Sequence, residues 1–283
     1  MGASIGAVLA DRGHTVLWAS KGRSPLTASR ARAANLTDAG EITAVVERSE
    51  IVMSICPPHA AFEVASRVAG SEVTFLDANA ISPQHSQEVG GLIERGGGQF
   101  VDGGIVGPPA RAGGRTRLFL AGTEAERIAE LFDGGPVFPS VLGERVGDAS
   151  AVKMAYAAWT KGTSALLLAI RALARANNVD EALLEEWQSS SGGALPDQCR
   201  RAAQQAATKG WRWVGEMEEI ASSFAAAGLP DGFHQAAARV YARAPRMESA
   251  PANDEILERV LLELGGDDSA GEDDAAGTSA GVL

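Results

Sequence analysis

Short apolar runs alternate with helical stretches through the first half of the chain. The runs are apolar on consecutive residues, which is typical of strands that are covered on both faces of a parallel sheet. Helical stretches at 60–68 and 83–95 lie between them. Alternating strands and helices at this spacing predict a doubly wound, Rossmann-like α/β domain. The five predicted strands are 15–18, 51–55, 73–76, 99–101 and 117–120.

The second half of the chain has only helical periodicity. Residues 148–177 predict one long helix, with Asp148 as its N-cap and Asn177 and Asn178 at its end. Further helices are predicted at 180–188, 196–207, 213–227 and 232–242. We therefore predict a dinucleotide-binding domain over 1–147 and an all-helical domain over 148–264. The remaining residues, 265–283, lack periodicity and predict a disordered acidic tail.

Charge and composition exclude several classes of protein. The chain of 283 residues has a formal net charge of −11, and five of its carboxylates lie in 265–283, which holds no Lys or Arg. An acidic chain without a basic patch is a poor ligand for nucleic acid. No apolar run reaches the roughly 20 residues of a membrane span. The two cysteines, Cys56 and Cys199, are too few for a disulfide framework or a zinc site, so we expect a cytoplasmic protein without a structural metal.

The opening segment, MGASIGAVLADRGHTV, predicts a helix ended by Gly13 and a strand from Thr15. In a dinucleotide-binding domain this is the helix whose N-terminus faces the pyrophosphate, followed by the second strand. The usual fingerprint, G-x-G-x-x-G after a first strand, is present only in its last glycine, Gly2. We expect Met1 and Gly2 to contact the cofactor, Met1 to be an internal methionine, and about ten more residues to precede it in the natural product or a relative. The alternative is a genuine start, which leaves the sheet without a central strand.

Several motifs resemble one family, the β-hydroxyacid dehydrogenase and 6-phosphogluconate dehydrogenase-like superfamily. Within it, the chain is most similar to the subgroup with a putative phosphogluconate dehydrogenase-like C-terminal domain. The matching segments are Met1-Gly2, Gly13-His14-Thr15-Val16, DANAISP at 77–83, VDGGIVGP at 101–108, GERVGDASAVK at 143–153 and the helical block 217–241.

The resemblance implies an enzyme with a small-molecule substrate and a homodimer formed through the helical domains. It places Lys153 at the family's catalytic lysine and Gly103 and Gly104 in the substrate-binding stretch. Two positions depart from the family: Ala157 stands where an asparagine is usual, and no lysine lies near Glu216 in the later helix. A second cation for a substrate carboxylate or phosphate is therefore not evident, and we interpret Glu216, Glu218 and Glu219 as a charged helix face.

Residues after the second strand favour NADP(H) over NAD. The strand is followed by Ser20, Lys21 and Arg23, and no carboxylate lies between Thr15 and Asp38. NAD enzymes usually place an acidic residue here for the ribose 2′-hydroxyl, whereas small and basic residues accept a 2′-phosphate. NAD remains possible, and the alternative for these residues is a solvated basic loop.

Three residues follow the next two strands at the carboxyl edge of the sheet. Cys56 and Pro57 would border the cofactor there, with Cys56 acting as a small apolar residue rather than a nucleophile. Asn79 would contact the nicotinamide ribose or the substrate; its alternative role is to cap the helix that begins near Ser82.

Hydride chemistry belongs to the cofactor, so the protein must orient the substrate and move one proton. Lys153 is the candidate general acid/base, because burial beside a cofactor lowers the pKa of a lysine. The alternative is a solvated helix lysine. Tyr156 and Thr160 would supply the polar substrate contacts that Ala157 lacks. We expect an NADP(H)-dependent oxidoreductase acting on a small hydroxy acid or its carbonyl compound. Imine reductase-like activity and a non-catalytic dinucleotide-binding protein are the alternatives.

Overall fold

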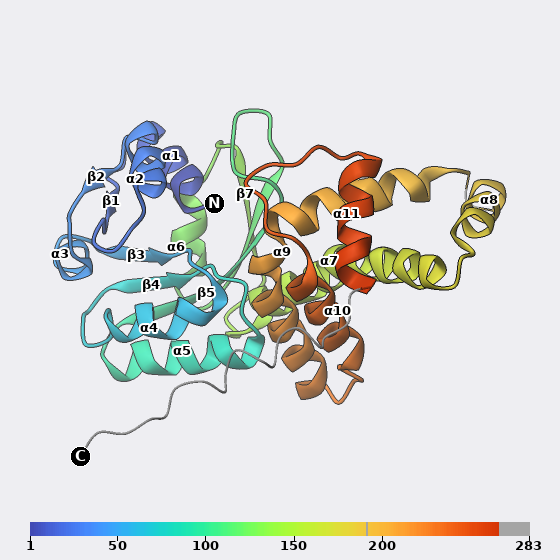
Figure 1. Ribbon diagram of the computed structural model, residues 1–283. Coiled ribbons are helices and arrows are strands. Elements are labelled where there is room, and N and C mark those ends of the chain that lie inside the picture. Colours follow the sequence, from blue (N-terminus) through green and yellow to red (C-terminus); the bar gives the residue numbers. More distant parts are fainter. Residues whose placement is uncertain (191, 266–283) are drawn as a thin grey trace, which may run out of the picture. The chain divides into compact units, whose positions relative to one another are not determined.

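The computed structural model describes residues 1–190 and 192–265 (Figure 1). The chain divides into two compact units: the first comprises Met1–Gly162 and Gly215–Ala238, and the second comprises Thr163–Val214 and the chain from Arg239 onward. The domain limits at 147 and 264 stay predictions. The predicted tail, 265–283, lies outside the described residues apart from Gly265, which ends helix α11.

The first unit contains a sheet of five strands in the order β3-β4-β5-β6-β7. All neighbouring pairs are parallel except β5 and β6, which are antiparallel. The doubly wound α/β class is confirmed, with this one antiparallel pair as a difference. Residues 107–115 connect β5 directly to β6, and so short a connection leaves no room for a crossover helix. The strands are β3 (Ile51–Ser54), β4 (Thr74–Asp77), β5 (Gln99–Val106), β6 (Thr116–Ala121) and β7 (Val137–Val141).

Helices cover both faces of this sheet. On one face, α1 (Gly2–Asp11) and α6 (Ala125–Glu130) pack into a core with β4, β5 and β6. On the other face, α4 (Ala61–Ser66) and α5 (Pro83–Arg95) form a second core around Phe75 and Phe100. Helix α5 has the predicted bounds. The sequence patterns missed α2 (Pro25–Ala33), α3 (Ile42–Val46), α6 and the edge strand β7, because these elements are short or, like α2, bury a single side chain.

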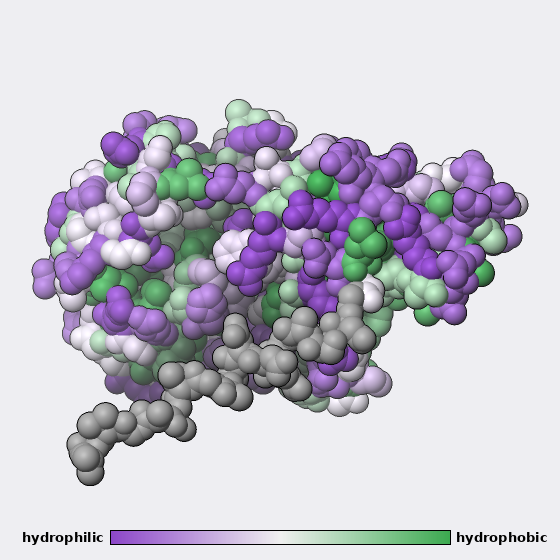
Figure 2. All heavy atoms as spheres, viewed as in Figure 1, coloured by the Kyte–Doolittle hydropathy of each residue, from purple (hydrophilic) through white to green (hydrophobic). Residues whose placement is uncertain are grey.

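A second, smaller sheet lies apart from the first. It pairs β1 (Leu17–Trp18) with β2 (Thr37–Asp38) in parallel. Between β1 and β3 runs a groove of about 990 Å³, lined by both strands and by Ile5 and Leu9 of α1. Figure 2 shows green, apolar side chains inside the hollowed part of this unit and a largely purple rim. None of the described residues places a strand in the groove, so the sheet is interrupted where the sequence predicts a missing first strand.

Beyond residue 147 the described residues form helices only, as predicted. The predicted helices 196–207 and 213–227 are wrong as separate elements, because α9 runs unbroken through Gly210 and Gly215. A Cβ on Gly210 would lie 3.5 Å from Tyr241, so the helices pack closely here, and such tertiary packing outweighs the cost of about 1 kcal/mol for a glycine in a helix. The helices are α7 (Asp148–Ala176), α8 (Asp180–Ser190), α9 (Ala194–Ala226), α10 (Gly232–Arg243) and α11 (Asp254–Gly265).

Ion pairs join the helices of the second unit. Arg171 of α7 is almost fully buried and binds both carboxylate oxygens of Asp180 in α8, at 2.6 and 2.8 Å. The paired carboxylate raises the pKa of the arginine, and the guanidinium lowers the pKa of Asp180. Arg175 pairs with Glu258, and Arg200 pairs with Asp254 at 2.9 Å, so charged contacts connect α7 and α9 to α11.

Asp102 of β5 fixes the start of α7. Its carboxylate is completely buried and accepts four hydrogen bonds. One oxygen accepts from the hydroxyls of Ser86 (2.9 Å) and Ser150 (2.6 Å), and the other from the backbone N–H groups of Gly147 (2.9 Å) and Ser150 (3.0 Å). The cap of α7 therefore comes from the sheet. Asp148, predicted as the N-cap, is instead the first helical residue and pairs with Arg145 at 2.8 Å.

Replacing Asp102 should therefore be costly. Asp102→Ala leaves buried hydroxyl and N–H donors without their acceptor, and we expect a loss of about 3 kcal/mol or more in the free energy of unfolding. The matched control is Asp148→Ala, which lies between the capped N–H groups of Gly147 and Ser150 and for which we expect a loss of about 1 kcal/mol or less. Urea unfolding followed by circular dichroism measures both. Equal losses in the two variants would contradict the anchoring role of Asp102.

The groove between β1 and β3 leads to a second prediction, that it accepts an added strand. Both strands turn an edge toward it, so an extended apolar segment joined ahead of Met1 can pair with both in parallel. We expect a chain extended by five valine or isoleucine residues and a short glycine-containing turn to have a higher Tm than the 283-residue chain. An extension of the same length made of Gly and Ser is the control. A Tm that both extensions leave unchanged would show that the groove does not accept a strand.

Candidate functional site

A polar network joins the carboxyl ends of β3 and β4. Asn79 is buried, and its side-chain oxygen accepts a hydrogen bond from the backbone N–H of Cys56 at 2.5 Å. Its amide nitrogen donates to Ser54 Oγ at 2.9 Å and to Asp77 at 2.8 Å. Asn79 therefore holds the loop after β3. The contact of Asn79 with nicotinamide or substrate stays a prediction. The alternative, that Asn79 caps α5, is wrong, because Ser82 caps this helix by accepting a hydrogen bond from the N–H of His85.

The ionisable groups of this network favour their neutral forms. Burial raises the pKa of the Cys56 thiol, although the Ser54 hydroxyl, 3.6 Å from the sulfur, opposes the shift. Burial also raises the pKa of Asp77 to about 7, against the hydrogen bonds from Asn79. A thiol with a raised pKa is a poor nucleophile, in keeping with the prediction that Cys56 is a small buried residue.

Five of the eight predicted cofactor residues line the groove between β1 and β3. They are Met1, Gly2, Arg23, Cys56 and Pro57. The first turn of α1 lines the groove beside Cys56 and Pro57. Arg23 lies close enough to Cys56 to influence the pKa of its thiol. The first turn of a helix and a guanidinium together favour an anion.

The other three predicted cofactor residues, Ser20, Lys21 and Asn79, are not among the residues that line the groove. Lys21 instead pairs with Glu41 at 2.5 Å, and both side chains are exposed. Glu41 lies beyond Asp38, outside the segment in which the sequence pattern predicts a ribose-binding carboxylate. The parallel pairing of β1 with β2, together with the bond from Lys21 N–H to the Gly40 carbonyl, brings this later carboxylate beside the loop.

Lys153 lies where α7 packs against β5. Its Nζ donates to the backbone carbonyl of Ile105 at 2.8 Å. Gly104 makes this approach possible, because a Cβ on it would lie 2.6 Å from the Ala149 carbonyl oxygen and 3.1 Å from Lys153 Cβ. A Cβ on Gly103 would lie 2.7 Å from Leu76. Both glycines are buried and have packing roles, and their contact with a substrate stays a prediction.

The charge of Lys153 is destabilised by its surroundings. Burial first and nearby Lys161 second lower the pKa of its ammonium to about 8, and Glu216 opposes both effects. Lys161 follows two helical turns after Lys153 and forms an ion pair with Glu216 of α9. Both side chains of that pair are mostly buried, at 14% and 17% exposed. A second cation that was not evident from the sequence therefore lies near Lys153, because this lysine comes from α7 and not from the later helix.

Glu216 and Glu219 are also not a solvated helix face. Glu219 binds the Nδ1 of His85 at 2.9 Å and accepts from the N–H of Ser82 at 2.7 Å, which ties α9 to the start of α5. Sequence reasoning missed these pairings because their partners lie more than 50 residues away along the chain.

Tyr156 and Thr160 flank the lysines on α7. Tyr156 is exposed and packs edge-on against Trp159, with ring centroids 5.6 Å apart. The hydroxyl of Thr160 donates to the carbonyl of Tyr156 at 3.0 Å. Ala157 is buried between the turns that carry Lys153 and Lys161. Contact of Tyr156 and Thr160 with a substrate stays a prediction.

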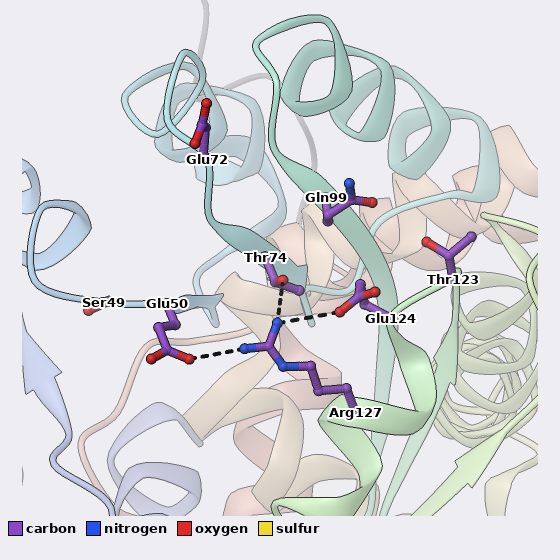
Figure 3. A pocket seen from close by; sticks show the side chains of 8 residues that line it. All are labelled: Ser49, Glu50, Glu72, Thr74, Gln99, Thr123, Glu124 and Arg127. Atoms are coloured by element: carbon purple, nitrogen blue, oxygen red, sulfur yellow. Dashed lines mark hydrogen bonds and ion pairs between the residues drawn. The ribbon is translucent and has the colours of Figure 1, made fainter.

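A second hollow lies at the opposite, amino edge of the sheet (Figure 3). Its centre is Arg127, which binds Glu50 at 3.0 Å, Glu124 at 3.4 Å and Thr74 at 3.5 Å. Ligands of open α/β sheets bind at the carboxyl ends of the strands, so this hollow is not the candidate site.

Among residues 1–190 and 192–265, no cluster of His, Cys, Asp or Glu could hold a metal ion. None of the helices formed by these residues is both long and apolar enough to cross a membrane.

Comparison with known proteins finds two matching domains. Residues 1–135 match the NAD binding domain of 6-phosphogluconate dehydrogenase, and residues 174–244 match a "Domain of unknown function (DUF1932)". An uncharacterised 28.5 kDa protein of Methanothermus fervidus is 30% identical over 184 residues, which cover 64% of this chain and 70% of that protein.

Two solved structures show the same fold. One, of a conserved protein of unknown function reported as structurally similar to 3-hydroxyacid dehydrogenases, is 27% identical, with a TM-score of 0.63 over 92% of this chain and 94% of that one. The other, the Mycobacterium tuberculosis 3-hydroxyisobutyrate dehydrogenase with L-serine, is 18% identical, with a TM-score of 0.68 over 94% and 96% of the two chains.

The α/β fold and the matched NAD-binding domain define a protein of the dinucleotide-binding class. The chain belongs to the 6-phosphogluconate dehydrogenase-like family, with the NAD-binding domain followed by the domain of unknown function.

Proposed function

We propose that the chain is an NADP(H)-dependent oxidoreductase that acts on a small hydroxy acid or the corresponding carbonyl compound. The observation that carries the proposal is Lys153, which is held against the Ile105 carbonyl and has a pKa of about 8. The matched NAD-binding domain and the dehydrogenase fold of the solved neighbours support it. When bound, the nicotinamide supplies the hydride chemistry.

The cofactor would bind at the carboxyl end of the groove. The N–H groups of the first turn of α1 would receive the pyrophosphate, and Arg23 would pair with the 2′-phosphate of NADP(H). Lys21 can join it, because an exposed ion pair such as that with Glu41 is worth only about 1 kcal/mol or less.

Lys153 would move the proton of the reaction. In oxidation, the neutral Nζ accepts the hydroxyl proton of the substrate as the hydride leaves; in reduction, the ammonium returns a proton to the carbonyl oxygen. A pKa of about 8 serves both directions near neutral pH, since each protonation state is then well populated. An ordinary lysine pKa, above 10, would leave the base almost entirely protonated.

Two alternatives have support in the same site. Ala157 is buried and places no hydrogen-bonding side chain one turn from Lys153, which favours an imine over a carbonyl substrate. A dinucleotide-binding protein without turnover is the other, because the sheet is interrupted beside the cofactor groove.

The proposal includes a cytoplasmic homodimer. The exposed ring of Trp159 supports an interface on α7, since large aromatic side chains favour buried contacts. Cys56 and Cys199 are both free thiols, in keeping with a reducing compartment.

Cofactor preference can be measured by titrating the tryptophan fluorescence of the chain with NADPH and with NADH. We expect tighter binding of NADPH, and Arg23→Ala should weaken it about tenfold while leaving NADH binding nearly unchanged, because a charge-assisted contact to the 2′-phosphate is lost. Arg32→Ala, an exposed arginine on α2, is the control. Equal affinity for the two cofactors would refute the preference.

The role of Lys153 is tested by substitution and by pH. Lys153→Ala should abolish turnover in a screen of 3-hydroxy acids, ketones and ketone–amine mixtures while retaining NADPH binding, and Lys209→Ala, an exposed lysine, should leave turnover unchanged. The oxidation rate should rise with pH through about 8, because the base must be neutral, and the reduction rate should fall over the same range. Full activity of the Lys153→Ala protein would rule out this mechanism.

A further inference from the structure

A buried carboxylate that takes no part in the proposed proton transfer lies one strand from the wall of the cofactor groove. Asp77, at the end of β4, is 1% exposed, and both of its carboxylate oxygens accept from Asn79. One accepts from the backbone N–H of Asn79 at 2.9 Å, and the other accepts from its amide NH2 group at 2.8 Å. The amide oxygen of Asn79 accepts from the backbone N–H of Cys56. Asp77 is therefore connected through Asn79 to the loop that follows β3.

This loop forms part of the groove wall. Residues 55–57 line the groove together with Ser54 and the first turn of α1, whereas Asp77 and Asn79 are not among the lining residues. Ser54 is the register partner of Asp77 in the neighbouring strand, and its hydroxyl accepts from the Asn79 amide at 2.9 Å. Asp77 thus lies outside the lining and would act on a bound dinucleotide through Asn79 and the loop.

Asp77 has a second carboxylate beside it. Its register partner in β5 is Asp102, which accepts four hydrogen bonds, whereas Asp77 accepts two from the described residues. Two neighbouring buried carboxylates repel when both are ionised, so the one with fewer donors takes up a proton. Burial, and to a smaller extent Asp102, raise the pKa of Asp77 to about 7, against the bonds from Asn79 and the nearby His85. Both protonation states of Asp77 are therefore populated near neutral pH.

Two more titratable groups lie near Asp77. His85 of α5 is paired with Glu219 of α9 at 2.9 Å, and burial raises the pKa of the Cys56 thiol, which keeps the thiol neutral. Within the part of the chain that the structure describes, Asn79 alone donates hydrogen bonds to Asp77. A change in the charge of Asp77 therefore acts first on Asn79.

The protonation state of Asp77 determines how the amide of Asn79 can be held. A carboxylate only accepts, so Asn79 turns its NH2 group toward Asp77 and its oxygen toward the Cys56 N–H. A proton on Asp77 adds a donor that opposes an N–H of Asn79. Rotation of the amide relieves this conflict, because its oxygen then accepts from Asp77, but the Cys56 N–H loses its acceptor. The Ser54 hydroxyl suits both orientations, since it can donate and accept.

We propose that Asp77 is a positioning residue that makes cofactor binding depend on pH: its ionised form orients Asn79 to hold the loop after β3, and its protonated form releases the loop. This inference rests on the proposed function and adds a means of regulating its cofactor site. Dinucleotide affinity should fall as the pH falls through about 7, and binding near this pH should release a proton from Asp77. Direct repulsion between an ionised Asp77 and the pyrophosphate would have the opposite sign.

The pH dependence is measured by tryptophan fluorescence with NADH as the probe, because the 2′-phosphate of NADPH itself titrates near pH ~6. We expect the wild type to bind NADH about tenfold more tightly at pH ~8 than at pH ~6, the change that one proton gives over about one pH unit. Asp77→Asn cannot ionise, and its NH2 group opposes one of the donors of Asn79. This variant should bind NADH as weakly as the wild type at low pH and should lose the pH dependence. Asp133→Asn, at an exposed aspartate, is the control and should keep it.

The route through Asn79 is tested by a second variant. Asn79→Ala removes the acceptor of the Cys56 N–H and should bind NADH weakly at both pH values, and adding Asp77→Asn should weaken binding no further. Circular dichroism checks that each variant is folded. Calorimetric titration of the wild type in buffers of different ionisation enthalpy needs no substitution and should show proton release near pH ~7. Proton uptake, or equal pH dependence in the wild type and Asp77→Asn, overturns the inference and leaves the proposed function standing.

A chain that binds neither NADH nor NADPH at any pH would fail the proposed function, and the loop is then tested without cofactor. Amide hydrogen exchange of the peptide that contains Cys56 is measured at pH ~6 and pH ~8 and corrected for the intrinsic effect of pH. The wild type should be more strongly protected at the higher pH, and Asp77→Asn should be weakly protected at both. Equal protection of the wild type at the two pH values would show that Asp77 does not control the loop.

Discussion

The carboxylate of Asp102 is the contact on which the rest of the site depends. A fully buried carboxylate is stable only when hydrogen bonds replace its lost hydration, and Asp102 obtains four of them from α5 and the start of α7. The first N–H groups of a helix need acceptors, and here the sheet supplies one. The same bonds therefore stabilise the charge and set the position from which α7 begins.

Once the start of α7 is fixed, the approach of the helix to β5 determines where Lys153 lies. Gly104 has no side chain that would hold α7 away from β5, and the partly buried Lys153 therefore reaches the Ile105 carbonyl. Its lowered pKa follows from this burial first and from Lys161 second. The close packing of α7 against Gly104 thus lowers the pKa of Lys153, and the proposed proton transfer depends on both the packing and the lowered pKa.

The groove beside α1 and the lysine cluster show how charge is distributed in the first unit. Arg23 lines the same groove as the first turn of α1, where an anion is favoured, and nearby Lys21, outside the groove, is paired with Glu41. At α7, two lysines share one glutamate. Both places are net positive within a chain whose overall charge is −11, so their positive potential comes from local placement and not from composition.

The sequence by itself determined the α/β class, most strands of the large sheet, the bounds of α5 and the long helix α7. Each of these follows from local periodicity, glycine positions and apolar runs, which act over neighbouring residues. The sequence also identified Lys153, through a motif. The tertiary structure alone decided that Asp102 caps α7, that Glu41 meets Lys21 and that Lys161 and Glu216 accompany Lys153. These contacts join residues far apart in the chain, and no local pattern encodes them, because they exist only when the sheet and helices have packed.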